Sequence, residues 1–291
     1  GGPLRPIRGC SGVAWGGGRT RNTPIGWRAD VGAGVGAARC GMRPRGGLMF
    51  SYFMCVCFGE RVTEAAKRRF MFGGKVKVPM VMRTASGAGT GAAAQHSQSL
   101  EACLAHFPGL KVVIPSTPYD AKGLLKTAIR DDNPVMFLEQ KTLYRTKGMV
   151  PEEEYSIPLG QADIKLAGSD CTVVTYGRMV NTCLTAAQEL EKDGVRLEVI
   201  DIRSLVPLDT QTILESVKKT KHVLIVHEAV QFCGFGAEIA GQIADSDAFY
   251  YLDAPIKRLG AKSTPIPFNP ILEAETFPTV PKIVAAVKSL L

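Results

Sequence analysis

The sequence holds few of the residues that build metal fingers or membrane spans. It has 4 histidines, and none of its 8 cysteines forms a C-x-x-C pair, which excludes the common zinc motifs. Cys55 and Cys57 form a C-x-C, a pattern as typical of small buried residues as of metal ligands. We expect reduced thiols in a reducing compartment. The longest apolar run, residues 48–58, is too short to cross a bilayer, so we expect a soluble protein with no membrane partner.

Acidic residues are scarce at the start of the chain. Residues 1–70 hold 12 Lys+Arg against 3 Asp+Glu, a balance of +9, which leaves 23 against 24, or −1, for residues 71–291. The same segment carries 15 of the 31 glycines, so the basic charge belongs to one distinct stretch. Aromatic residues do not interleave its arginines, and we expect no nucleic-acid partner. Its composition is typical of a transit peptide but lacks an amphipathic period, and we expect a fragment or a processed form.

Length and pattern predict two α/β domains. A chain of 291 residues exceeds what one hydrophobic core usually serves. From Lys75 onward short apolar strands alternate with helical segments, which predicts parallel sheets covered on both faces. Residues 146–160 contain two prolines and an acidic run, which is typical of a linker. The expected strands are 76–84, 111–115, 134–139, 171–177, 196–203 and 222–229. The expected helices are 118–130, 179–193, 209–220, 234–243 and 279–290.

Three glycines, Gly87, Gly89 and Gly91, precede an expected helix start. A glycine-rich turn before a helix can bind an anion through its backbone N–H groups. No lysine follows in the pattern of a phosphate loop, so we favour the alternative, a tight turn that lets two backbones pack closely.

Two polar groups stand where chemistry is expected. His96 ends the glycine-rich loop among glutamine and serine residues and is an acid–base candidate, with a structural hydrogen-bonded histidine as the alternative. His227 and Glu228 end an apolar strand, where parallel sheets meet their ligands. Capping of the helix that begins near Gly234 is the alternative for this pair.

Residues 91–139, GAAAQHSQSLEACLAHFPGLKVVIPSTPYDAKGLLKTAIRDDNPVMFLE, resemble the central region of the beta subunits of 2-oxo acid dehydrogenases, which are transketolase-like and depend on thiamin diphosphate. The second domain is similar through EVIDIRSLVPLD, GFGAEIA and LDAPIKRLGAKSTPIPF. Upstream, AGVGAARCGMRP (33–44) is similar to the family's Gly/Ala-rich helix, MFSYFM (49–54) to its cofactor-contacting strand, and TEAAKRRFMFGG (63–74) to the helix that follows.

The resemblance implies an α/β fold with two parallel-sheet domains. The implied parts are an atypical basic segment (1–30), a pyrimidine-binding domain (31–145), the linker (146–160) and a transketolase C-terminal-like domain (161–291). It also implies an alpha subunit in an alpha2-beta2 heterotetramer, which holds the diphosphate and magnesium while the beta subunit grips the aminopyrimidine ring of thiamin diphosphate. The acyl product passes to a lipoyl-bearing dihydrolipoyl acyltransferase.

The implied reaction is the oxidative decarboxylation of a 2-oxo acid. Pyruvate is the expected substrate, and branched-chain 2-oxo acids and acetoin are the alternatives. The expected compartment is the mitochondrial matrix, with the plastid stroma or the bacterial cytoplasm as alternatives.

The resemblance also assigns roles to individual residues. His96 matches the active-site histidine that positions the substrate and the lipoyl group during acyl transfer. Met49 and Phe53 match positions that contact the aminopyrimidine. The backbone carbonyls of a further set match positions that hold a potassium ion in several members: Met80, Ala128, Ile129, Asp131 and Asn133.

One departure puts the activity in question. Trp27, in NTPIGW, stands where the family writes a glutamate that hydrogen-bonds the cofactor ring and promotes removal of the thiazolium proton. Tyr52 also replaces a family asparagine or aspartate. Because a positioned proton-transfer group contributes about 10²–10⁴-fold, Trp27 predicts a catalytically impaired structural subunit. The alternative is that residues 1–70 depart from the true product of the gene.

Overall fold

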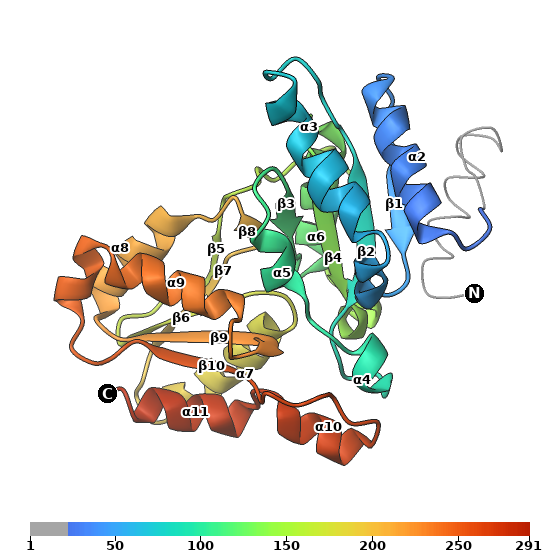
Figure 1. Cartoon of the computed structure of the whole chain (residues 1–291). Coiled ribbons are helices and arrows are strands. Elements are labelled where there is room, and N and C mark those ends of the chain that lie inside the picture. Colours follow the sequence, from blue (N-terminus) through green and yellow to red (C-terminus); the bar gives the residue numbers. More distant parts are fainter. Residues whose placement is uncertain (1–22) are drawn as a thin grey trace.

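The structure, a computed structural model, describes residues 23–291 as two α/β units side by side (Figure 1). The sheet of the first unit has the order β1-β2-β4-β3-β8, with four parallel strands and an antiparallel edge strand. Its strands are β1 (Arg45–Leu48), β2 (Val81–Ser86), β4 (Val135–Gln140), β3 (Lys111–Val113) and β8 (Ser204–Val206).

Helices cover both faces of this sheet because the strands are apolar on both sides. On one face, buried side chains of α2 (Trp27–Arg39), α3 (Ala66–Met71) and α5 (Glu101–Ala105) share a core with the strands. On the other face, α6 (Pro118–Arg130) packs through Leu124 and Ala128. The sequence favours its start at Pro118, because Thr117 caps the helix by accepting a hydrogen bond from the Asp120 backbone N–H.

The second unit repeats the plan with the strand order β10-β9-β6-β7-β5, and only β5 runs antiparallel. The strands are β10 (Lys257–Ala261), β9 (Val223–Val230), β6 (Cys171–Thr175), β7 (Leu197–Asp201) and β5 (Asp163–Leu166). One face is covered by α8 (Thr210–Thr220) and α9 (Phe235–Ala244), and the other by α7 (Met179–Glu191) and α11 (Val280–Lys288). The short elements are η1 (Ser51–Cys55), η2 (Glu60–Ala65), α4 (Ala93–His96), η3 (Lys141–Arg145), η4 (Asp247–Tyr251) and α10 (Pro270–Thr276).

Most expected elements are confirmed, with boundaries that differ by a few residues, and the interpretation of MFSYFM (49–54) as a strand is wrong. The chain leaves the sheet after Leu48 and forms η1 instead. None of the described helices is long and apolar enough to cross a membrane. The cysteines among the described residues are free thiols, and of the C-x-C pair Cys57 is buried whereas Cys55 is exposed.

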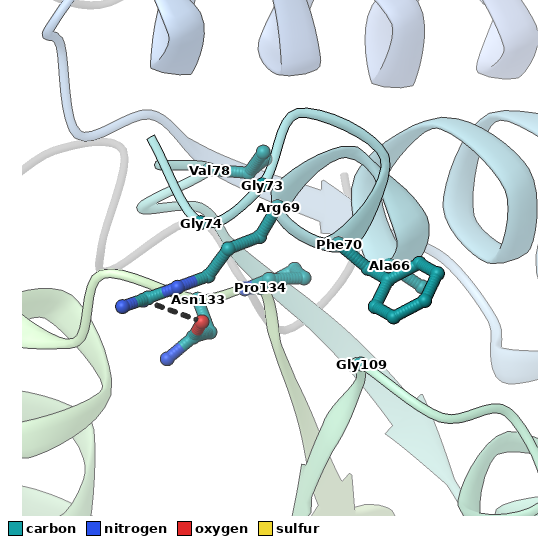
Figure 2. A pocket seen from close by; sticks show the side chains of 9 residues that line it. All are labelled: Ala66, Arg69, Phe70, Gly73, Gly74, Val78, Gly109, Asn133 and Pro134. Carbon is teal, nitrogen blue, oxygen red and sulfur yellow. Dashed lines mark hydrogen bonds between the residues drawn. The ribbon is translucent and has the colours of Figure 1, made fainter. Parts of the chain in front are cut away.

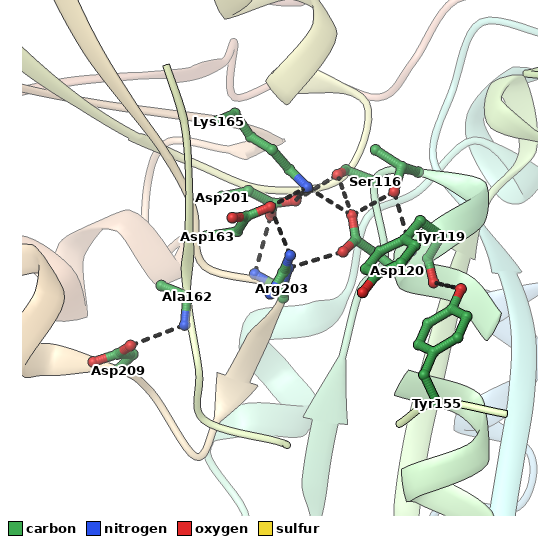
Figure 3. A network of polar contacts seen from close by, with 11 residues as sticks. Ser116, Tyr119, Asp120, Tyr155, Ala162, Asp163, Lys165, Asp201, Arg203 and Asp209 are labelled. Carbon is green, nitrogen blue, oxygen red and sulfur yellow. Dashed lines mark hydrogen bonds and ion pairs between the residues drawn. The ribbon is translucent and has the colours of Figure 1, made fainter. Parts of the chain in front are cut away.

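A buried ionic network joins the two units (Figure 3). Asp120, on α6, pairs with Arg203 at 2.9 Å and with Lys165 at 2.8 Å, and both cations come from the second unit. They also pair with Asp163, each at 2.6 Å. Burial raises the pKa of Asp201, in the same network, to about 6, partly offset by its hydrogen bond from Ser116. The network therefore fixes how the carboxyl edges of the two sheets face each other.

Candidate functional site

The candidate site lies at the carboxyl ends of three adjacent strands, where ligands of parallel sheets are usually held. β1 leads into residues 49–55, β2 into the glycine-rich loop and α4, and β4 into η3. Since these strands are neighbours in the order β1-β2-β4, the three segments that follow them meet at one edge. This edge brings together Phe53, His96 and Lys141.

Aromatic rings surround His96. Its imidazole centre lies 5.0 Å from Phe50, 5.5 Å from Tyr52 and 6.0 Å from Phe53. Phe53 in turn lies 5.5 Å from the ring of Trp27, at the start of α2. The structure thus places Trp27, Phe53 and His96 in one aromatic cluster. Met49 lies between β1 and this cluster and is half-buried.

The polar groups of His96 are only partly used. Its Nδ1 is buried and has no hydrogen-bond partner among residues 23–291. Its backbone carbonyl accepts a hydrogen bond from the Lys141 ammonium. A buried nitrogen without a partner is costly, so a ligand or water is expected to meet it. This orphan atom beside aromatic rings fits a heteroaromatic ligand that carries polar substituents.

Trp27 leaves this site without the expected carboxylate. Its indole is half-buried and packs against the core of the first unit. The neighbouring residue Arg28 pairs with Glu60 at 3.0 Å, so that carboxylate already has a cationic partner. A backbone hydrogen bond and, after it, the hydrogen bond from Arg28 hold the pKa of Glu60 below its usual value. The positions fit an aromatic ring of a cofactor, but Trp27 offers no group that could accept a proton.

The glycine-rich loop binds carboxylates of the protein itself. The Ala88 N–H donates to Glu228 at 2.5 Å, and the Gly89 N–H donates to Glu273 at 2.9 Å. Gly87 and Gly89 have positive φ of 85° and 87°, a conformation that favours glycine. These contacts agree with the tight-turn interpretation, since two of the N–H groups that a phosphate loop would offer already have anionic partners.

Glu228 joins the two units, whereas His227 packs within the second unit. The Glu228 carboxylate, besides contacting the loop, pairs with Arg178 at 2.9 Å. Burial raises the pKa of Glu228, and Arg178 opposes this change. His227 is fully buried, its Nδ1 lies 3.0 Å from the Ala229 carbonyl, and burial lowers its pKa to about 4, so it is neutral. The start of α9 at Gly234 receives no side-chain hydrogen bond, so the helix-capping interpretation is wrong, and the ligand-binding interpretation stays a prediction.

The positions assigned to potassium lie at the amino ends of the strands of the first sheet. A six-residue strand, β4, separates them from the candidate site, a distance of roughly 15–20 Å. There Arg43 donates to the backbone carbonyls of Ile129 at 3.1 Å and Asp131 at 2.8 Å, and the Met80 carbonyl accepts from the Val135 N–H at 2.9 Å. The carbonyl oxygens of Ile129 and Asp131 are therefore already occupied by the Arg43 guanidinium, and this arrangement does not fit a potassium ion bound to the same two oxygens. Ala128 lies in the last turn of α6.

The same edge carries a cavity of about 450 Å³ (Figure 2). It lies between α3 and the turn before β4, and Arg69 donates to the Asn133 side chain at its wall at 2.9 Å. The cavity is mainly apolar and does not reach His96. No group of three or more His, Cys, Asp or Glu residues within the described part of the chain could hold a metal ion.

Sequence reasoning missed three residues around the site. Lys141 and Arg178 are charged groups near the loop, and their partners come from distant segments that no local pattern reveals. Phe50 lies within the MFSYFM segment, and its ring is nearer to His96 than the rings of Tyr52 and Phe53 are.

The fold and the site define a transketolase-like chain. Residues 11–147 match the transketolase pyrimidine-binding domain family, and residues 160–283 match the transketolase C-terminal domain family. A solved structure described as "Split gene transketolase, inactive beta4 tetramer" superposes with a TM-score of 0.82, covering 100% of this chain and 89% of that chain. Its 20% identity shows the fold alone.

Relatives narrow the class further. The beta subunit of acetoin:2,6-dichlorophenolindophenol oxidoreductase from Bacillus subtilis (strain 168) is 50% identical over 276 residues, which cover 94% of this chain and 80% of the relative. The pyruvate dehydrogenase E1 component subunit beta of Rickettsia felis is 47% identical over 272 residues, covering 94% and 83%. The chain belongs to the family of beta subunits of 2-oxo acid dehydrogenase decarboxylating components. It is therefore a subunit of a thiamin-diphosphate-dependent oxidoreductase and is expected to work with an alpha partner.

Proposed function

We propose that this chain completes the active site of a pyruvate dehydrogenase-type decarboxylating component together with an alpha subunit in an alpha2-beta2 heterotetramer. The observation that carries this proposal is the convergence of Trp27, Phe53 and His96 at the carboxyl edge of the first sheet. Thiamin diphosphate, when bound, supplies a nucleophilic carbon for attack on the carbonyl of the substrate. The acyl unit then passes to the lipoyl group of a dihydrolipoyl acyltransferase.

The residues of this chain would bind the cofactor ring, exclude water from it and transfer a proton during acyl transfer. Phe53 and Met49 would line the aminopyrimidine, and the aromatic rings would exclude water from it. His96, whose Nδ1 is unpartnered within the described chain, would hold the incoming lipoyl group by a hydrogen bond and move a proton during acyl transfer. We assign magnesium and the diphosphate to the alpha subunit. Potassium at residues 128–133 would require Arg43 to move away, and it stays a prediction, as does the mitochondrial matrix as compartment.

The test is to co-express this chain with an alpha subunit from a close relative. Decarboxylation of pyruvate at saturating thiamin diphosphate would be followed with 2,6-dichlorophenolindophenol as electron acceptor. We expect a stable complex and a rate of carbon dioxide release that is measurable but low, because Trp27 offers no proton acceptor. A stable complex that neither releases carbon dioxide from any 2-oxo acid nor reduces the dye with acetoin would contradict the catalytic proposal and indicate a structural subunit.

Acetoin is the second candidate substrate, and one observation favours it. The relative that is named for acetoin is 50% identical, against 47% for the pyruvate dehydrogenase subunit. The same complex should therefore be assayed with acetoin and with a branched-chain 2-oxo acid. Dye reduction by acetoin that exceeds the reduction by pyruvate at equal concentration would reassign the substrate. Acetoin carries no carboxylate, so its cleavage would release acetaldehyde in place of carbon dioxide, with the same residues lining the site.

A further inference from the structure

Lys141 is a buried lysine that lacks the usual reason for being buried. The residue is 9% exposed and opens η3 directly after β4. Buried lysines normally pair with a carboxylate. Among residues 23–291, however, no salt bridge joins Lys141 to an acidic side chain.

Its two contacts both lead to His96. The ammonium donates to the backbone carbonyl of His96, and it lies 5.0 Å from the centre of the Phe50 ring. That ring lies 5.0 Å from the imidazole of His96. Lys141 thus contacts the histidine's backbone directly and its ring through one aromatic neighbour.

The segment that carries His96 cannot hold its own shape. α4 has four residues, far too few for a stable isolated helix, so its conformation depends on tertiary contacts. His96 is its last residue, and its carbonyl has no partner within the helix, a position where a cation is favourable. The other hydrogen bonds of this segment run through Gln98. Its side chain donates to the Ala94 carbonyl at 3.0 Å, and its carbonyl accepts from the Gly87 N–H at 3.2 Å and from the hydroxyls of Ser51 and Ser86 at 3.2 and 3.4 Å. Lys141 is the charged group at the histidine itself.

The unfavourable burial of the Lys141 ammonium indicates a role beyond stability. Burial lowers the pKa of Lys141, and the carboxylates of Glu228 and Glu273 act in the opposite direction from across the domain boundary. The same two carboxylates hold the Gly-rich loop that precedes His96. The carboxylates of Glu228 and Glu273 therefore attract the Lys141 ammonium and also accept hydrogen bonds from the loop N–H groups.

From these contacts we propose that Lys141 is a positioning residue for His96: it fixes the carbonyl at the end of α4 and, through Phe50, the direction of the imidazole. The inference rests on the proposed role of His96 in acyl transfer. Lys141 itself does not touch the reacting atoms. Loss of the ammonium should affect the step that needs an oriented imidazole, and leave the earlier decarboxylation nearly unchanged.

The experiment compares Lys141→Met with Lys141→Arg and with Lys147→Met, an exposed lysine in the following segment as matched control. Each complex with the alpha subunit is assayed for dye-linked decarboxylation and for acylation of a lipoyl domain. A small displacement of a positioned group can lower a reaction rate by about 100-fold. In Lys141→Met we therefore expect the rate of acylation to fall by about tenfold to 100-fold while the rate of decarboxylation changes little. Lys141→Arg should recover much of the loss, and Lys147→Met should resemble the unchanged chain.

A second readout does not depend on turnover. Diethyl pyrocarbonate modification of the full chain, followed by mass spectrometry, reports the reactivity of His96, with the exposed His106 as an internal reference. We expect severalfold faster modification of His96 in Lys141→Met and an unchanged rate for His106. Unchanged His96 reactivity, or an equal fall of both enzymatic steps without rescue by arginine, would overturn the proposal. A His96→Gln complex that acylates normally would instead refute the role of His96 and thus the proposed function.

Discussion

Trp27 and His96 both lie beside Phe53, so the residue that departs from the family and the residue that matches it share one cluster. The match at His96 could be predicted from the sequence because it lies within a long similar string. The consequence of Trp27 could not, since a pattern shows that a carboxylate is missing but not what fills its place. The structure shows an indole packed against the core rather than a misplaced or solvent-exposed side chain.

Trp27→Glu is expected to raise dye-linked decarboxylation of the alpha–beta complex by about 10²–10⁴-fold, the usual contribution of a positioned proton-transfer group. Trp27→Phe is the matched control, because it removes bulk without adding a carboxylate and should give no such gain. Both variants are measured at saturating thiamin diphosphate. If the glutamate variant binds the alpha subunit but turns over no faster, the substitution at position 27 alone does not limit the activity.

Elements with strong apolar runs or a clear cap were predicted well, and edge elements were not. α6 begins at Pro118 and ends at Arg130 as expected, since Thr117 and Pro118 mark its start. β5 and β8 were missed because β5 alternates partly exposed residues and β8 has three residues. β8 also leaves its own unit to pair with β3, a long-range choice that no local pattern encodes.

A buried acid joins helix α5 to the residue that directly follows strand β6. Glu101, on α5, accepts a hydrogen bond from the Tyr176 hydroxyl at 2.9 Å. Burial raises the pKa of Glu101 from 4.5 to about 7, with the Tyr176 hydrogen bond acting in the opposite direction. The folded chain therefore binds this proton more tightly than the unfolded chain. Its contribution to stability is present below pH 4.5 and is lost as the pH rises through about 7.

Glu101→Gln should remove this pH dependence while its amide oxygen still accepts from Tyr176. Relative to the unchanged chain, the variant should gain free energy of unfolding between pH 5 and pH 8, by roughly 3 kcal/mol at most. Urea unfolding at the two pH values measures the difference, with exposed Glu191→Gln as control. An equal effect of Glu101→Gln at both pH values would show that Glu101 does not titrate in this range.

At the scale of the whole molecule, the two units behave as halves of one structure. A single core cluster contains α2 and α3 of the first unit and α8 and α9 of the second. The sequence predicted two domains and a linker, but no local pattern indicated that the units would share a core or that β8 would join the first sheet. The site lies beside this boundary, since the loop that precedes His96 is held by Glu228 and Glu273 from the second unit.

Arg203→Met tests whether the ionic network sets this arrangement. The guanidinium pairs with Asp120, which is fully buried, so its loss leaves that carboxylate with fewer cationic partners and should cost about 3 kcal/mol of unfolding free energy. Exposed Arg196→Met is the control, with an expected change within about 0.5 kcal/mol.

Because Lys165 still pairs with Asp120 at 2.8 Å, the units should loosen rather than separate. Proteolysis of the 146–160 segment should then become faster, and acyl transfer should fall, since the carboxylates that hold the His96 loop move with the second unit. Equal unfolding free energies and equal cleavage rates for the two variants would show that the shared core alone fixes the units.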